Sequence, residues 1–147
     1  MPDDALPQEI FSAVLDTLIP ARDESLPGAG SLGIGASVEP KLGGFVRLVA
    51  AALAALDALA RERSGVPFAQ LPVEERAPLV GEVDASHPGF VESLVYNAYT
   101  GYYQDPRVAV ALGLKSEPPH PGGYELEMGD LGLLAAVRRR EKLYREL

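Results

Sequence analysis

Apolar side chains recur every three or four residues along most of this 147-residue chain, a spacing that predicts amphipathic helices. No stretch alternates apolar and polar residues for long enough to predict a strand. The expected helices cover about residues 6–19, 37–64, 73–83, 86–104, 105–113 and 130–147. The pattern therefore predicts an all-α fold, a single-domain bundle of five to six helices over residues 1–147.

Proline, glycine and short polar residues mark the expected ends of the helices. Ser37 is expected to cap the long second helix, and Asp105 followed by Pro106 is expected to open a short one. Pro78 lies inside the third helix, where its missing N–H predicts a kink or two shorter pieces. Residues 20–36 and 114–129 are rich in glycine and proline and are expected to form long irregular loops.

The first of these loops contains Gly28-Ala29-Gly30-Ser31-Leu32-Gly33, which matches the G-x-G-x-x-G pattern of dinucleotide-binding loops. That pattern holds a pyrophosphate when it follows a buried strand, opens a helix, and precedes an acidic residue by about 20 positions. Here a helix is expected before the loop, further residues separate it from the next helix, and Asp57 lies in mid-helix. We interpret the match as fortuitous, with glycines that supply backbone freedom in a long connection.

The charges are unevenly distributed along the chain. The formal net charge of −8 argues against a nucleic-acid partner, because binding to phosphates requires a basic surface. Five of the 13 basic residues nevertheless fall in the last ten positions: Arg138, Arg139, Arg140, Lys142 and Arg145. This basic helix end is open to three interpretations. It docks onto an anionic partner, docks onto the chain's own acidic body, or is a solvated helix end whose cations suit the helix dipole.

The chain offers few residues for catalysis or metal binding. It has no cysteine, which excludes disulfides, zinc–thiolate sites, iron–sulfur clusters and thiol nucleophiles. Its two histidines, His87 and His120, each adjoin a proline and are expected in surface turns. The paired carboxylates of Glu74 and Glu75 are explained by a solvated helix N-terminus. We therefore expect no catalytic, cofactor-binding or metal-binding residue.

Neither a membrane span nor an export signal is expected. The most apolar run, Leu48–Leu56, has nine residues, whereas crossing a bilayer takes about 20. The start, Met1-Pro2-Asp3-Asp4, is acidic and lacks the basic and apolar regions of a secretory signal. The sequence as written predicts a soluble, cytoplasmic protein.

One segment is a candidate for binding, Tyr99–Arg107, where three of the six tyrosines fall within five residues. Tyrosine is enriched in interface cores and ligand pockets because it combines apolar area with a hydroxyl group. Tyr99 and Tyr102 lie on the apolar stripe of their helix, which favours a place in the core, whereas Tyr103 points away from it. Gly101 lets another backbone approach closely. Core packing and a functional surface both remain open for this segment.

Several short motifs follow one another in a specific order and spacing. They are Leu18-Ile19-Pro20 with Gly28-Ala29-Gly30, Leu56-Asp57-Ala58-Leu59-Ala60-Arg61, Pro67-Phe68-Ala69-Gln70-Leu71, Gly101-Tyr102-Tyr103-Gln104-Asp105-Pro106-Arg107-Val108, Ala111-Leu112-Gly113 and Pro121-Gly122-Gly123-Tyr124. In these motifs the chain, from about Phe11 to Tyr124, resembles the gluconate 2-dehydrogenase subunit 3 family, the small accessory subunits of membrane-associated flavin dehydrogenases.

The resemblance implies a partner rather than a catalyst. In such complexes a large flavoprotein of the glucose-methanol-choline type oxidises a sugar or sugar acid, and a cytochrome c subunit accepts the electrons. The small subunit assists maturation and export of the flavoprotein, so FAD is expected in the partner and not on this chain. Including the family's recurrent positions, the candidate contacts with a partner or ligand are Tyr99, Gly101, Tyr102, Tyr103, Asp105, Pro106, Arg107 and Tyr124.

The chain departs from the family pattern at its start, where family members commonly carry a twin-arginine export signal. This departure predicts a cytoplasmic member, or a periplasmic one if the signal was removed or the partner carries it. Two alternatives to the accessory subunit stay open. One is a stand-alone helical small-molecule-binding protein or orphan enzyme, and the other is a self-associating homo-oligomer.

Overall fold

The computed structural model describes residues 6–115, 123 and 128–141. In these residues there are seven α-helices, four 3-10 helices and no strand, which confirms the predicted all-α fold. The α-helices are α1 (Gln8–Leu18), α2 (Gly35–Val38), α3 (Val46–Ser64), α4 (Val73–Ser86), α5 (Phe90–Gln104), α6 (Pro106–Ala111) and α7 (Ala135–Arg138). The 3-10 helices are η1 (Glu39–Lys41), η2 (Gly43–Phe45), η3 (Phe68–Gln70) and η4 (Leu131–Leu134).

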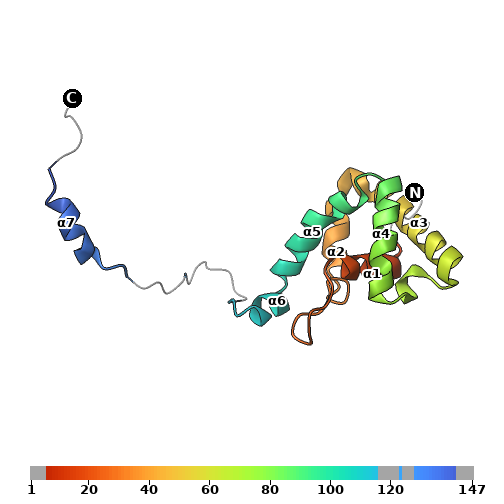
Figure 1. Cartoon of the computed structure of the whole chain (residues 1–147), viewed down its shortest axis with the longest axis horizontal. Coiled ribbons are helices and arrows are strands. Elements are labelled where there is room, and N and C mark those ends of the chain that lie inside the picture. Colours follow the sequence, from red (N-terminus) through yellow and green to blue (C-terminus); the bar gives the residue numbers. More distant parts are fainter. Residues whose placement is uncertain (1–5, 116–122, 124–127, 142–147) are drawn as a thin grey trace, which may run out of the picture. The chain divides into compact units, whose positions relative to one another are not determined.

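The chain divides into two units, residues 1–117 and residues 118–147. In the first unit, α3 and α5 form opposite flanks of the helical body, and α4 lies between them (Figure 1). Apolar side chains from each of the α-helices α1 to α6, and from η3, make up the core. Its largest fully buried members are Phe11, Phe68, Phe90, Leu15, Leu53, Leu56 and Leu94.

The second unit contains η4 and α7 in its described part, where every side chain is exposed. The carboxylate of Asp130 accepts a hydrogen bond from the Gly132 N–H at 2.8 Å and so caps η4. In its described part, the helix predicted over 130–147 is a 3-10 helix followed by α7, which ends at Arg138. Residues 142–147 lie outside the described part of the chain.

The long helix predicted from Ser37 begins later, at Val46. Gly43 has a φ of +53°, a left-handed conformation that interrupts a right-handed helix and separates η2 and α3 from α2 and η1 before them. Ser37 is not a cap, since its hydroxyl donates to the Ile34 carbonyl at 2.8 Å. The predicted far end is confirmed, with Gly65 at a φ of +71° just after Ser64.

Two further expectations concern prolines. Pro78 lies within α4, which the structure shows as one helix rather than two pieces. Pro106 occupies the first position of α6, and the Asp105 carboxylate accepts from the Arg107 N–H at 2.9 Å, as the sequence predicted.

The stretch Gly43–Ser64, which joins η2 to α3, is long and apolar enough to cross a membrane, with a mean hydropathy of 1.7 over an 18-residue window. A window of that length includes the charged residues Arg47 and Asp57 on either side of the apolar run Leu48–Leu56. The expectation that no stretch is long enough for a membrane span considered this nine-residue run alone and was therefore too narrow. The apolar side of α3 is used in the core, where Val49, Leu53 and Leu56 are fully buried. A core helix has the same composition, so the stretch is weak evidence for a membrane span.

Candidate functional site

The segment Tyr99–Arg107 is divided between the core and the surface by the helical turn of α5. Tyr102 keeps 5 % of its surface exposed, whereas Tyr99 keeps 45 % and Tyr103 keeps 55 %. The expectations for Tyr102 and Tyr103 are therefore confirmed. The core placement of Tyr99 is wrong, because position 99 lies at the edge of the buried stripe, which is centred on Leu94, Ala98 and Tyr102.

The buried members of the segment fasten the glycine-rich loop to α5. The Tyr102 hydroxyl donates to the Pro27 carbonyl at 3.1 Å, and burial, reinforced by Tyr103 and Asp23, raises the pKa of Tyr102. Gly101 is buried against α2 and the residue before it, and a Cβ there would lie 3.2 Å from Ser37 Oγ and 3.6 Å from Ile34 Cβ. Tyr102 and Gly101 therefore hold the backbone of the glycine-rich loop and of the start of α2 against α5.

Asp105 and Arg107 form a second fastening of the same loop. The Arg107 guanidinium donates to both carboxylate oxygens of Asp105, at 2.9 and 2.7 Å, and to the Leu32 carbonyl at 2.8 Å. These bonds from Arg107 hold the pKa of Asp105 below its usual range. The Asp105 side chain also caps α6, so this pair connects a helix start to the loop. Asp105, Pro106 and Arg107 thus have structural roles.

The G-x-G-x-x-G loop packs against α1 instead of presenting its N–H groups to a ligand. A Cβ at Gly30 would collide with the Ser12 carbonyl oxygen, and a Cβ at Gly28 would collide with the Asp16 carboxylate. Asp16 in turn accepts from the Ser31 N–H at 3.0 Å and from its hydroxyl at 3.2 Å. The expectation that all three glycines supply backbone freedom is therefore only partly correct. Gly28 and Gly30 permit close approach, and of the three only Gly33, at a φ of +75°, needs backbone freedom.

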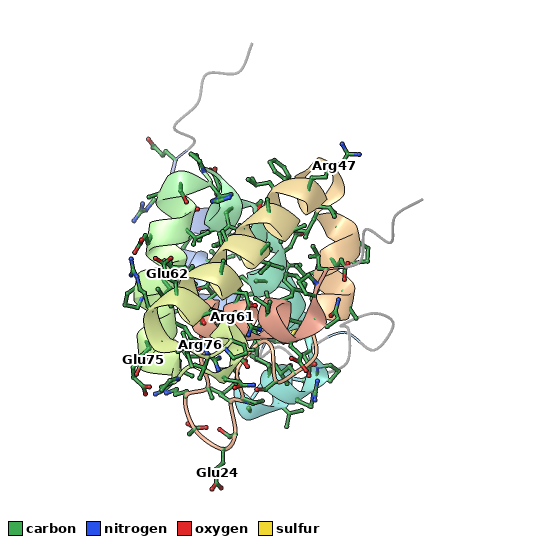
Figure 2. The ribbon with its side chains drawn as sticks, turned by 90° about the vertical axis from the view of Figure 1, so that its right-hand side faces the viewer. Glu24, Arg47, Arg61, Glu62, Glu75 and Arg76 are labelled. Atoms are coloured by element: carbon green, nitrogen blue, oxygen red, sulfur yellow. The ribbon has the colours of Figure 1, made fainter. Side chains whose placement is uncertain are left out.

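Charged side chains of the first unit support the fold or face solvent. Arg76 donates to the Leu71 and Ala69 carbonyls at 2.9 Å each. Asp57 accepts from Arg61 at 2.7 Å, which lowers the pKa of Asp57, and also from the Phe68 N–H at 3.1 Å. Viewed from the α3 side, Arg47, Glu62 and Glu75 point away from the helical body (Figure 2). No group of three or more potential metal ligands occurs among the described residues.

Three of the four exposed phenylalanine and tyrosine side chains in the described part of the chain lie on one side of α5. Glu92, Val95, Tyr96, Tyr99, Thr100, Tyr103 and Gln104 line an open hollow of about 810 Å³, which we call the tyrosine face. Tyr99 and Tyr103 stack with ring centroids 6.1 Å apart, and Tyr103 meets Tyr102 edge-on at 5.4 Å. These ring contacts connect the exposed rings to the buried Tyr102, which holds them in place.

Tyr96 is the tyrosine of this face that lies outside the predicted segment Tyr99–Arg107, as do Glu92 and Val95. It is the most exposed of the three tyrosines, at 77 %. The signal was present in the spacing, since positions 96, 99 and 103 follow one another by three and four residues and must share one side of a helix. The predicted segment begins at Tyr99, where the tyrosines cluster in sequence, whereas the exposed surface begins one turn earlier.

The tyrosine face is mainly aromatic and apolar and carries little charge. It presents aromatic rings, three phenol hydroxyls and a single charged group, the Glu92 carboxylate. Tyr124, the remaining candidate, lies outside the described residues, as does His120.

The chain matches a known protein family over most of its length. A model of the family described as gluconate 2-dehydrogenase subunit 3 matches residues 7–122, which include all of α1 to α6. No curated protein and no solved structure matches the chain.

Proposed function

Because the chain belongs to the gluconate 2-dehydrogenase subunit 3 family, we propose that it is a non-catalytic accessory subunit of a flavin-dependent dehydrogenase. Its partner is the large subunit, a flavoprotein of the glucose-methanol-choline type that oxidises a sugar or alcohol and carries the FAD. A cytochrome c subunit belongs to the same complex. The contribution of this chain is to stabilise the large subunit during maturation.

The tyrosine face is the observation that supports binding of a partner. Three partly exposed tyrosines on one helix concentrate apolar area with hydroxyl groups, the composition found at the centre of protein interfaces. Contiguous exposed apolar patches on a protein surface often mark sites of protein–protein interaction. We therefore assign the large subunit to this face.

The hollow also bears on the alternative of a stand-alone ligand-binding protein. Small-molecule sites are concave and bury most of their ligand, usually between several elements of the fold. The tyrosine face lies along one side of the single helix α5, with all seven lining residues from that helix. This shape favours a macromolecular partner over an enclosed small molecule.

The experiment is affinity purification of the tagged chain from its native host, with an absorbance scan for flavin and mass spectrometry of the eluate. We expect a stoichiometric flavoprotein and a yellow eluate with the wild-type chain. Tyr99→Glu places a charge in the centre of the face and should abolish recovery of flavin. Val110→Glu, at a 63 % exposed position of α6 outside the face, is the matched control and should retain it.

Either of two results would contradict the proposal. A colourless eluate without any oxidoreductase would exclude the flavoprotein partner. An unchanged yellow eluate with Tyr99→Glu would show that the large subunit binds elsewhere. Circular dichroism of both variants verifies that the helical fold is intact before the eluates are compared.

A further inference from the structure

We propose that a second hollow, beside the N-terminal half of α5, binds a small zwitterion, namely an α-amino acid with an apolar side chain. This hollow has a volume of about 460 Å³, and we call it the zwitterion hollow. The residues of its lining that carry the argument are Lys41, Leu42, Phe45, Glu92, Ser93 and Asn97. The proposal concerns the chain itself and does not rest on the dehydrogenase partner.

Two segments that are far apart in the sequence build the zwitterion hollow. Residues 41–45, from η1 and η2, form one wall, and the N-terminal half of α5 forms the other. A hollow between separate elements can surround a small molecule, which one side of a single helix cannot do. Its volume also lies within the range of about 300–1,000 Å³ that is usual for ligand pockets. The zwitterion hollow therefore has the construction that the tyrosine face lacks.

Both walls of the hollow are held in place by the core. On the first wall, Leu42 is buried. On the second, Phe90 and Leu94 of α5 are fully buried, and they fix the helix that carries the polar lining residues. The hollow is thus formed before a ligand arrives, as ligand pockets usually are.

The lining carries one positive and one negative side chain, Lys41 and Glu92. Neither forms an ion pair with the other or with any further side chain that the structure describes. Opposite charges that line one hollow without pairing leave room for a molecule that carries both signs. The carboxylate of the ligand would lie at the Lys41 ammonium group, and the ammonium group of the ligand would lie at the Glu92 carboxylate.

Asn97 and Ser93 add neutral polar groups to the same hollow. Asn97 is half-buried, and its side-chain amide makes no hydrogen bond within the described part of the chain. Its carbonyl and its NH₂ group are therefore available to the ammonium and carboxylate ends of a ligand. The Ser93 hydroxyl donates to the Phe90 carbonyl at 2.7 Å, and its oxygen can still accept a hydrogen bond.

The apolar part of the lining indicates the side chain of the ligand. Phe45 is 54 % exposed and lines the hollow together with the buried Leu42. Burial of an apolar side chain against these two residues removes their remaining apolar surface from water. The combination of both charges with an apolar wall therefore favours an amino acid such as leucine.

The charges also predict which ligands are rejected and how tightly the zwitterion binds. A ligand with only a carboxylate meets repulsion from Glu92, and a ligand with only an ammonium group meets repulsion from Lys41. Both of these side chains are exposed to solvent, so each ion pair contributes little. We expect a dissociation constant of about 0.1–3 mM for leucine.

The zwitterion hollow and the tyrosine face share Glu92, whereas Lys41 belongs to the hollow and Tyr99 to the face. Lys41→Met should therefore retain the yellow eluate, and Tyr99→Glu should retain the binding of leucine. Failure of the flavoprotein experiment leaves the zwitterion proposal intact, and absence of leucine binding leaves the flavoprotein experiment unaffected. The two proposals are thus refuted by different measurements.

The first test is an NMR titration of the isotope-labelled full chain with L-leucine. We expect saturable shifts that are concentrated in residues 41–45 and 89–97. Isocaproate, which lacks the ammonium group, and isoamylamine, which lacks the carboxylate, should each bind at least about threefold more weakly. A dissociation constant for leucine above about 3 mM, shifts confined to other residues, or a smaller preference over either analogue would overturn the proposal.

The second test uses charge variants to separate recognition from folding. Lys41→Met keeps the apolar stem of the side chain and should decrease the preference for leucine over isoamylamine, because attraction of leucine and repulsion of the amine are lost together. Glu92→Gln should decrease the preference for leucine over isocaproate in the same way. A merely structural effect would weaken all three compounds equally and leave the preferences unchanged.

Arg47→Met is the matched control for Lys41→Met. Arg47 is a neighbouring cation that lies outside the lining of the hollow and points away from the helical body (Figure 2). This variant should bind leucine as the wild type does, whereas Lys41→Met should bind it at least about threefold more weakly. Equal effects of the two variants, or unchanged preferences in Lys41→Met and Glu92→Gln, would refute the assignment of the two charges.

Discussion

Replacement of Gly30 by alanine tests whether the glycine-rich loop serves packing or ligand binding. The added Cβ would collide with the Ser12 carbonyl oxygen and lie 2.7 Å from the Ser12 carbonyl carbon, closer than real Cβ contacts come. Both atoms belong to the backbone of α1, which cannot move without the whole helix. The loop must therefore shift outward, and with it Ala29, which is fully buried.

The expected cost follows from three terms. Overpacking at a rigid backbone costs about 1–3 kcal/mol. An outward shift also weakens the bonds from Ser31 to the Asp16 carboxylate, at 3.0 and 3.2 Å, which contribute about 1–2 kcal/mol. The reduced freedom of alanine in the unfolded chain offsets about 0.4–1 kcal/mol. The free energy of unfolding should therefore decrease by about 2–4 kcal/mol, and the Tm by roughly 10 °C.

Thermal and urea unfolding followed by far-ultraviolet circular dichroism measure this change. Gly44→Ala is the matched control, because a Cβ at Gly44 would meet nothing within 4 Å and its φ is not positive. A decrease below about 0.5 kcal/mol for Gly30→Ala, or one equal to that of the control, would refute the packing argument. An increase in the wild-type Tm on addition of NAD or FAD would refute the interpretation of the motif.

Two further variants test the fastenings of the same loop. Tyr102→Phe removes the hydroxyl that donates to the Pro27 carbonyl and leaves that carbonyl without this partner. The free energy of unfolding, measured in urea, should decrease by about 1–2 kcal/mol. An unchanged value would show that water replaces the bond. Asp105→Asn removes a carboxylate whose pKa is lowered in the folded state by Arg107. Such a carboxylate stabilises the fold at pH values above its unfolded pKa of about 4. This stabilisation is lost as the pH decreases through the pKa of the folded state. The variant should therefore be less stable than wild type at pH 7 and lose less stability on acidification, as urea midpoints between pH 7 and pH 2 would show, and a parallel pair of pH profiles would contradict the assignment.

The division of α5 into two sides connects the fold to the proposed binding of a partner. Tyr102 and Asp105 fasten the loop, while Tyr96, Tyr99 and Tyr103 are free for contacts outside the chain. Variants at Tyr102 or Asp105 should therefore act through stability, whereas variants at the exposed tyrosines should act through association. This separation lets unfolding and binding measurements be interpreted independently.

The sequence by itself determined the helical class and several local features. Apolar periodicity predicted α1, α4 and α5, and the Asp105–Pro106 pair predicted the start of α6, because these signals depend on residues close together in the chain. The pattern could not show that Gly43 interrupts the helix before Val46, because glycine within a helical pattern is compatible with continuation or with a break.

Only the tertiary structure decided which tyrosines are buried and what the glycines do. Residue 102 reaches Pro27 across 75 positions of sequence, and Gly30 packs on Ser12 of another element. A period of 3.6 residues places Tyr99 at the border between core and surface, and the position of the neighbouring helices decides which side of that border it occupies. Such contacts between distant segments depend on how the helices pack, and neither composition nor spacing contains that information.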